Sequence, residues 1–238
     1  MLSGLDLAVM EFPEEKFIVQ DLVPKGLVIF STELLATGRA LAMDMAMRVV
    51  KGEKLWKMDT KQGAVLYMVH HHALATARNL IMEMSVRIPD DLYVGVMTEN
   101  SLELALAGVK SFVKDHNNVS MVVIEMRDMV EQCEDAVYVP ADTLPQYRAL
   151  RETALENGIA VMVVLSSDTT QVKQGSMFNV DMKCLSDEAD GNQEMWILND
   201  ENTEAILRVH TPPREPGLWS IGYQRKKRRW EENTGDRL

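Results

Sequence analysis

Short apolar runs alternate with amphipathic stretches along most of the chain, a rhythm typical of proteins built around a parallel sheet. The apolar runs are rich in Val, Ile, Leu and Met and nearly continuous, which favours strands buried on both faces. They predict strands near residues 27–31, 64–69, 92–97, 119–125 and 159–165. Helical periodicity predicts helices near residues 38–50, 73–86, 100–115 and 143–157. The pattern therefore predicts an α/β fold with a mainly parallel central sheet flanked by helices.

The rhythm changes beyond residue 190. The runs 194–198 and 205–209 are separated by a polar turn and predict a hairpin, and a third short run, 218–223, follows proline-containing turns. These runs predict an antiparallel extension at the C-terminal end of the sheet. The polar segment 166–192 before them, acidic in its second half, is expected to be a loop.

The segment 27–51 has the layout of a strand that leads into a helix at a phosphate-binding loop. Thr37 is the expected N-cap of this helix, and Gly52 follows its last residue. A phosphate-binding loop of the pattern G-x-x-x-x-G-K-[ST] supplies backbone amides, a lysine for the terminal phosphates and a hydroxyl for Mg²⁺. None of the 13 glycines is followed by lysine. The segment keeps the layout of the loop without its ligands.

Several segments between about residues 17 and 223 resemble the RecA-like ATPases of the RepA helicase type. This family is related to hexameric replicative helicases and is common on plasmids, phages and integrated elements. The resemblance rests on the segments 17–19, 22–27, 40–46, 62–67, 121–125 and 157–164. It implies a RecA-like P-loop NTPase fold, with one domain over residues 1–223.

The same resemblance implies where a nucleotide site would lie. In such ATPases the P-loop lysine and its serine come just before the helix at 40–46, where this chain has Gly38 and Arg39, and a shift of one residue still leaves no lysine. His71 stands at the glutamate that activates the attacking water. Glu125 stands at the Walker B aspartate that holds Mg²⁺. The vestigial nucleotide site therefore comprises Thr37, Gly38, Arg39, His71 and Glu125.

The missing ligands have a large energetic cost. A hydrogen bond to a charged group contributes roughly 1.5–3 kcal/mol, so loss of the lysine and the serine-bound metal costs about 3–6 kcal/mol. That corresponds to about two to four decades of affinity. A guanidinium at Arg39 recovers part of this loss, whereas Glu33 adds a negative charge and Leu34 and Leu35 occupy the space of the phosphate. We expect weak or no nucleotide binding, no hydrolysis and no cofactor.

Composition narrows the class of protein. With 238 residues and 46% apolar content, the chain can bury one sizeable core. Cys133 and Cys184 lack the spacing of a metal site and fit a reducing compartment. The sequence has neither a signal-peptide pattern nor an apolar run of membrane-spanning length. We therefore expect a cytoplasmic protein without a membrane partner. The net charge of −11 argues against a wholly basic surface.

Residues 224–238 carry the one concentrated basic feature and are expected to form a flexible C-terminal tail. One interpretation is an arm that binds DNA, RNA or an acidic partner. The other is a solvated charge run that pairs with the chain's own acidic surface. The aromatic side chain among them could stack on a base or dock on the domain. The residues concerned are Arg225, Lys226, Lys227, Arg228, Arg229 and Trp230.

The sequence His70-His71-His72 raises the question of a metal site. Adjacent residues on a strand point to opposite faces, so at most two of the three rings are expected to converge. We therefore predict no metal site here, and expect His71 to form hydrogen bonds with neighbours such as Glu125.

Two classes of function compete. In the first, the chain is a pseudo-ATPase with a structural or regulatory role in mobile-element DNA replication or maintenance. In the second, it is a weak ATP-binding, DNA-binding helicase-like ATPase that uses Arg39 and Glu125 in place of the usual residues, with ATP and Mg²⁺ as cofactors. A third hypothesis is a relative in fold alone that binds an unrelated small ligand where ATP would sit. Homo-oligomers, a related ATPase, or DNA bound through the tail are the partners that these hypotheses imply.

Overall fold

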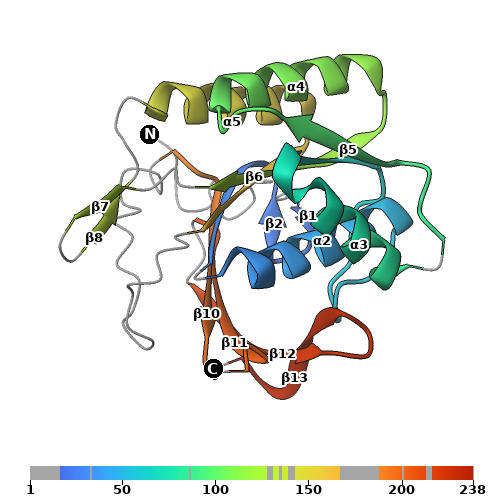
Figure 1. Cartoon of the computed structure of the whole chain (residues 1–238), viewed down its shortest axis with the longest axis vertical. Coiled ribbons are helices and arrows are strands. Elements are labelled where there is room, and N and C mark those ends of the chain that lie inside the picture. The colour runs from blue at the N-terminus through green and yellow to red at the C-terminus, as the bar shows by residue number, and fades with distance from the viewer. Residues whose placement is uncertain are drawn as a thin grey trace, which may run out of the picture.

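The computed structural model describes residues 17–32, 34–85, 87–127, 131–133, 136–138, 143–166, 188–199, 201–212 and 216–237 (Figure 1). Its largest element is a sheet of nine strands with the order β13-β12-β11-β10-β3-β9-β6-β4-β5. The strands are β3 (Gly26–Thr32), β4 (Ala64–His70), β5 (Leu92–Met97), β6 (Val119–Arg127), β9 (Ala160–Ser166), β10 (Gly191–Ile197), β11 (Glu204–His210), β12 (Gly217–Gln224) and β13 (Arg229–Arg237). Two small two-stranded sheets, β1 (Phe17–Val19) with β2 (Val23–Pro24) and β7 (Glu131–Cys133) with β8 (Ala136–Tyr138), complete the described strands.

The sheet is parallel from β10 to β5 and antiparallel from β10 to β13. The five strands predicted from apolar runs correspond to β3, β4, β5, β6 and β9, and the predicted hairpin corresponds to β10 and β11. The α/β class, the mainly parallel sheet and the antiparallel C-terminal extension are thus confirmed.

Helices cover both faces of the sheet. Helix α2 (Leu35–Lys51) and helix α3 (Leu74–Met84) pack on one face, while α4 (Leu102–Asp115) and α5 (Leu144–Asn157) pack on the other. Figure 1 shows α4 and α5 above strands β5 and β6, and α2 and α3 below them. Strands β3, β6 and β9 contribute alternate side chains to each face, so their apolar runs are buried on both sides.

The helix after β3 begins earlier than its sequence predicts. Helix α2 starts at Leu35, with Leu34 as N-cap and no side-chain cap, whereas we expected a start at residue 38 behind a Thr37 cap. Thr37 lies in the first turn, where its hydroxyl donates to the Leu34 carbonyl at 2.7 Å. The helix end is as expected, because Gly52 adopts a left-handed φ of 66° and its N–H bonds the last turn.

The C-terminal segment differs from the expected flexible tail. Residues 229–237 form β13, which pairs antiparallel with β12 through a turn at residues 225–228. Trp230 is only 1% exposed and belongs to the core under α2. Burial of this large ring anchors the segment, and a charge count alone did not reveal that anchor.

Two sequence-based expectations concern residues at the limits of the described ranges. The loop predicted at 166–192 lies mostly outside them, as does Glu33. None of the helices in the described part of the chain combines the length and the apolar character that a membrane span requires.

Candidate functional site

The junction between β3 and α2 is a two-residue connection. The strand ends at Thr32 and the helix begins at Leu35, so the residues expected to form a phosphate loop are already in the first helical turn. The Leu34 carbonyl accepts bonds from the Thr37 and Gly38 amides at 3.1 and 3.2 Å, and from the Thr32 hydroxyl at 3.1 Å. These bonds hold the chain in a tight turn in which the Thr37 and Gly38 amides are used within the chain.

Gly38 has a packing reason to be glycine. A Cβ at this position would lie 2.5 Å from Cγ2 of Thr32, a distance that real Cβ contacts do not show. The absence of a side chain lets α2 approach the end of β3 closely. This close approach accounts for the glycine without a phosphate.

Arg39 and Glu125 form a buried ion pair between α2 and β6. The Arg39 guanidinium donates from Nε to Oε1 at 2.7 Å and from Nη2 to Oε2 at 2.6 Å, a bidentate arrangement. The Tyr67 hydroxyl, from the neighbouring strand β4, donates to Oε1 at 2.9 Å. The arginine is 8% exposed and the glutamate 2%. The structure thus brings together two of the predicted site residues as partners of each other.

The pKa of Tyr67 reflects this environment. Burial raises it well above the ordinary value, and the adjacent Glu125 carboxylate raises it further. The phenol therefore stays protonated at physiological pH and keeps donating to the carboxylate. Groups from α2, β4 and β6 thus form one polar cluster within the core.

The two leucines expected to fill the phosphate space have different environments. Leu35 is buried beneath the helix, whereas Leu34 is 37% exposed at the N-cap. Leu34 is the N-cap and Leu35 the first residue of α2, so both belong to the helix start and not to an open phosphate loop.

His71 does not lie against Glu125. It follows the end of β4 in a short 3₁₀ helix, η1 (His71–Ala73), and its side chain is exposed, while the partners of Glu125 are Arg39 and Tyr67. The predicted hydrogen bond to Glu125 is therefore wrong. The carboxylate lies inside the α2 face of the sheet, and the histidine lies beyond the strand end.

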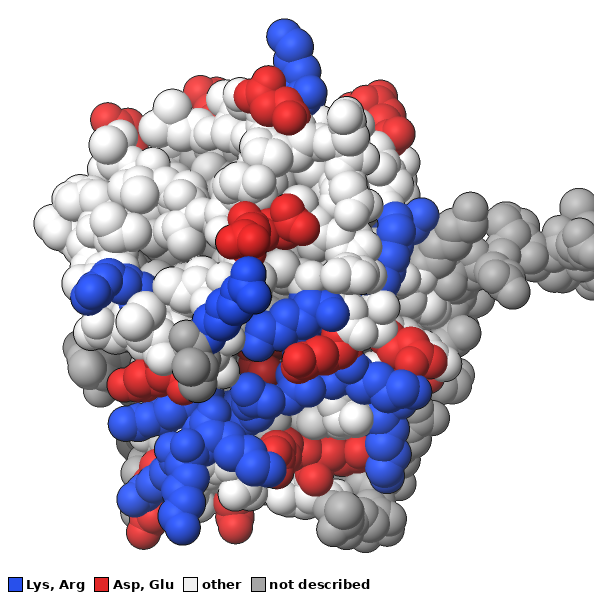
Figure 2. All heavy atoms as spheres, turned by 90° about the vertical axis from the view of Figure 1, so that its right-hand side faces the viewer, with Lys and Arg blue, Asp and Glu red and all other residues white. Residues whose placement is uncertain are grey.

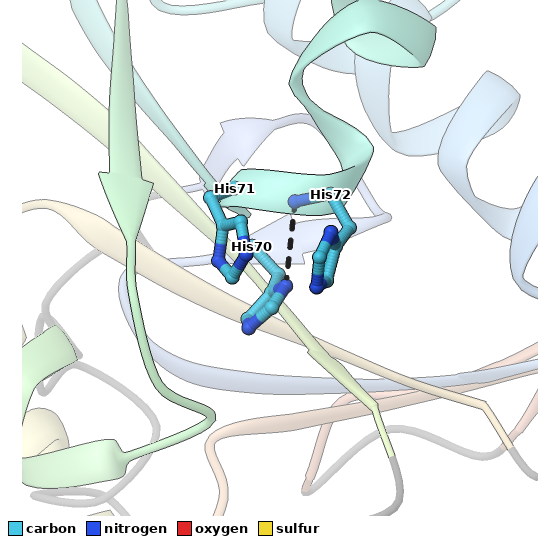
Figure 3. Close-up of side chains that lie close together, drawn as sticks. All are labelled: His70, His71 and His72. Carbon is cyan, nitrogen blue, oxygen red and sulfur yellow. Dashed lines mark hydrogen bonds between the residues drawn. The ribbon is translucent and has the colours of Figure 1, made fainter.

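The three histidines converge, contrary to expectation (Figure 3). Their ring centroids lie 4.2 Å apart for His70 and His71, 5.0 Å for His70 and His72, and 3.8 Å for His71 and His72. One ligand atom from each ring lies within 4.8 Å of the other two. Strand alternation does not apply, because the strand ends at His70. The turn of η1 places the rings of His71 and His72 beside that of His70.

The basic C-terminal residues pair with acids of the same chain. Arg225 contacts Glu201 at 3.0 Å, and Lys227 contacts Glu231 at 2.7 Å. Arg228 reaches Glu83 at 3.4 Å. The interpretation of a charge run that pairs with the chain's own acidic surface is the one this geometry favours.

Trp230 docks on the domain through both polar ends of its residue. Its Nε1 donates to the Thr37 carbonyl at 3.3 Å, and its own carbonyl accepts from Trp56 Nε1 at 3.0 Å. Of the two roles considered for this ring, docking is therefore the one observed. The same indole lies beside the first turn of α2, next to the vestigial site.

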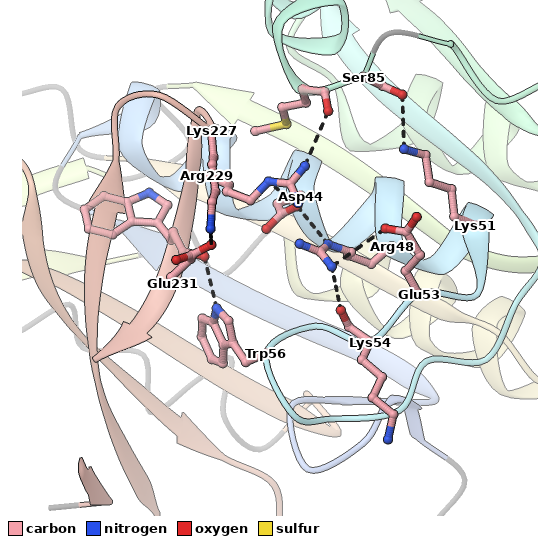
Figure 4. Close-up of polar contacts among 12 residues, drawn as sticks. Asp44, Arg48, Lys51, Glu53, Lys54, Trp56, Ser85, Lys227, Arg229 and Glu231 are labelled. Carbon is pink, nitrogen blue, oxygen red and sulfur yellow. Dashed lines mark hydrogen bonds and ion pairs between the residues drawn. The ribbon is translucent and has the colours of Figure 1, made fainter. Parts of the chain in front are cut away.

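Sequence reasoning missed a second charge cluster beneath the C-terminal hairpin (Figure 4). Asp44 on α2 is 1% exposed and accepts from Arg48 Nε at 3.2 Å, and Arg229 Nε lies 3.9 Å from the same oxygen. Within the described residues, Asp44 Oδ2 has no hydrogen-bond partner. Burial raises the pKa of Asp44, and the two arginines oppose the rise. An aspartate in an otherwise apolar helix segment was the available signal.

Acidic residues at the end of the polar segment 166–192 pair with arginines of α5. Asp190 accepts two bonds from the Arg151 guanidinium, at 2.9 and 2.7 Å, and Glu188 accepts from Arg148. Asp190 also accepts from the Leu27 amide at 3.0 Å, which ties the start of β3 to α5. Through these contacts the two acids link α5 to β3 and to the start of β10.

A surface pocket of about 440 Å³ lies between β5 and α4, on the opposite face of the sheet from α2. Its lining includes Val96, Leu104 and Phe112, and none of the vestigial-site residues. The third hypothesis placed a small ligand where ATP would sit, and this pocket lies elsewhere.

Neither a comparison with models of protein families nor a comparison with curated proteins finds a match to this chain.

Proposed function

We propose that this chain is a catalytically degenerate RecA-like ATPase homologue of the RepA helicase type. In this proposal it has a structural or regulatory role in the replication or maintenance of mobile-element DNA. The observation that carries the loss of catalysis is the buried Arg39–Glu125 pair. The residues that would replace the P-loop lysine and the Walker B acid bind each other.

Both groups would have to be freed before they could serve a nucleotide. Arg39 already donates two hydrogen bonds to Glu125, and Tyr67 donates a third to the same carboxylate. Removal of one partner from a buried ion pair costs about 3–5 kcal/mol. A triphosphate or Mg²⁺ would have to offset that cost before it gained any net affinity. The pair therefore disfavours the alternative hypothesis, in which Arg39 and Glu125 bind ATP and Mg²⁺.

The architecture supports the family part of the proposal. A mainly parallel sheet covered on both faces, with an antiparallel extension at its C-terminal end, is what the resemblance implies. The setting in mobile-element DNA, and association with a second copy or with a related ATPase, rest on the resemblance alone.

Calorimetric titration with ATP and Mg²⁺ tests the proposal. We expect no saturable heat for the native chain. Micromolar binding that disappears in Arg39→Met, but persists in the matched surface variant Arg148→Met, would overturn it. That result would instead establish the helicase-like alternative.

The charge distribution gives an expectation for DNA. On the face drawn in Figure 2, Lys and Arg side chains form a band that is interrupted by Asp and Glu. Interleaved signs make a poor track for a phosphate backbone. We expect binding of short single- and double-stranded DNA to be weak and abolished by moderate salt. Salt-resistant binding that is lost in a variant with 225–229 neutralised would favour a DNA-binding role.

A further inference from the structure

Three consecutive imidazole rings meet at the point where β4 ends. His70 is the last strand residue and has extended backbone angles, φ −65° and ψ 145°, while His71 and His72 begin η1. The reversal from strand to 3₁₀ turn brings the second and third rings back towards the first. Figure 3 shows the three side chains facing one another.

The backbone turn that gathers the rings is itself held by a histidine. His70 Nδ1 accepts a long hydrogen bond, 3.4 Å, from the His72 amide. The helix α3 that follows begins at Leu74 and buries Ala77 and Ile81 against the core. The turn is therefore fixed at both ends, by the sheet before it and by the packed helix after it.

The separations suit a metal ion after small side-chain rotations. Zn²⁺ binds imidazole nitrogen at about 2.0–2.1 Å, so two nitrogens of a tetrahedral site lie roughly 3.3 Å apart. The ligand atoms here lie within 4.8 Å of one another. His71 and His72 are exposed, and rotation about their side-chain bonds can close a gap of this size. If the metal took Nδ1 of His70, the long bond to the His72 amide would be lost.

We propose that His70, His71 and His72 form a site for a divalent transition metal of the Zn²⁺ class. Three neutral nitrogen ligands select this class over Mg²⁺ and Ca²⁺, which prefer oxygen. Three protein ligands leave a fourth position for water or for an anionic ligand.

The place of the cluster in the fold agrees with a ligand site. It lies beyond the carboxyl end of a parallel strand, the edge at which open α/β sheets bind their ligands. The net charge of −11 also raises the local concentration of cations around the protein. The metal site uses none of Arg39, Glu125 and Tyr67. The test of metal binding is therefore independent of the proposed loss of ATPase activity.

Calorimetric titration of the whole chain with Zn²⁺ in a non-chelating buffer tests the site. We expect one saturable Zn²⁺ per chain. Each of His70→Ala, His71→Ala and His72→Ala should weaken binding by more than about tenfold, since loss of an outer-shell partner alone costs roughly 10–100-fold in known sites. Co²⁺ should give the visible absorption of a low-coordinate nitrogen site in the native chain, and Mg²⁺ should give no heat.

His210→Ala and His116→Ala are the matched controls, because they remove the two histidines outside the cluster. Both should bind Zn²⁺ as the native chain does, and the effect of Zn²⁺ on each variant is compared with that variant's own metal-free melting temperature. Zn²⁺ should raise the melting temperature only where the cluster is intact. The proposal is overturned by absence of saturable binding, by binding that survives the triple alanine variant, or by any single cluster variant that binds like the native chain.

Discussion

Helix α2 carries two buried charged residues, Arg39 and Asp44. The two clusters that they form differ in how many of the carboxylate oxygens have hydrogen-bond partners. The Glu125–Arg39 cluster joins α2 to β4 and β6, and both carboxylate oxygens accept hydrogen bonds. The Asp44 cluster joins the same helix to the C-terminal hairpin, and one of its oxygens has no partner among the described residues. A buried carboxylate whose two oxygens both accept hydrogen bonds is held in place. A buried carboxylate with one oxygen that accepts none retains part of the free-energy cost of its desolvation.

This contrast separates two origins of buried charge. Arg39 and Glu125, the residues that the family resemblance assigns to catalytic positions, pair with each other. Asp44 corresponds to no catalytic position, and it contacts Arg229, a residue of the segment expected to be free. The first cluster ties α2 to the central strands, and the second attaches the C-terminal hairpin to the same helix.

The largest expected effect comes from breaking the complete cluster. Glu125→Gln removes the carboxylate charge that pairs with the buried Arg39 guanidinium, so the free energy of unfolding should fall by about 3–5 kcal/mol. Chemical denaturation measures the change.

The double variant Arg39→Met, Glu125→Gln is the matched control, since it removes the buried cation and keeps an acceptor for Tyr67. It should be more stable than Glu125→Gln alone. If the free energy of unfolding of Glu125→Gln falls by less than about 1 kcal/mol, the buried pair does not contribute to stability as proposed.

A smaller effect is expected at the incomplete cluster. Arg229→Gln removes a positive charge near Asp44 and a bond to the Met84 carbonyl at 3.4 Å, so it should cost about 1–2 kcal/mol. Thermal or chemical unfolding measures it.

Arg225→Gln is the comparison, because the Arg225–Glu201 pair is largely exposed and its loss should change stability by less than about 1 kcal/mol. Equal effects of the two substitutions would show that Arg229 acts as an ordinary surface charge.

The smallest expected effect is a pH dependence at Asp44, since burial and the two arginines act in opposite directions. Its pKa is raised in the folded state, so the folded protein binds the proton more tightly than the unfolded chain does. The resulting stabilisation is present below the unfolded value of about 3.8 and is lost as the pH rises through the raised pKa.

Stability measured from pH 3 to pH 8 on the native chain and on Asp44→Asn tests this. As the pH rises from about 3.8 through the raised pKa of Asp44, the native chain should lose stability relative to the variant. Parallel curves would show that Asp44 has an ordinary pKa.

The strands could be predicted because their cause is local. Runs such as Val161 to Val164 are apolar at every position, and a strand buried on both faces needs only that. The start of α2 could not be predicted in the same way. Thr37 is a good cap by type, yet the helix begins at Leu35, and Gly38 packs against Thr32 at the end of β3. That contact joins residues close in sequence, but it depends on how α2 leaves β3, which the residue types alone do not indicate.

Of the polar cluster, the sequence singled out Arg39 and Glu125 but neither Tyr67 nor the pairing geometry. Arg39 and Glu125 were singled out by their positions, but their mutual pairing depends on α2 lying over β6. At most two of the histidine rings were expected to converge, because strand alternation was extended past His70, where β4 ends. The basic segment was judged by charge, and the buried indole of Trp230 was the residue that decided its structure.

The position of β3 in the sheet has a consequence for synthesis on the ribosome. This early strand lies between β9 and β10, whose residues follow it by more than a hundred positions. Its backbone groups therefore find their partners only after nearly the whole chain has been made. Such long-range pairing slows folding and leaves an apolar strand uncovered in the nascent protein, so a holding chaperone should matter more for this chain than for a helical bundle of equal length.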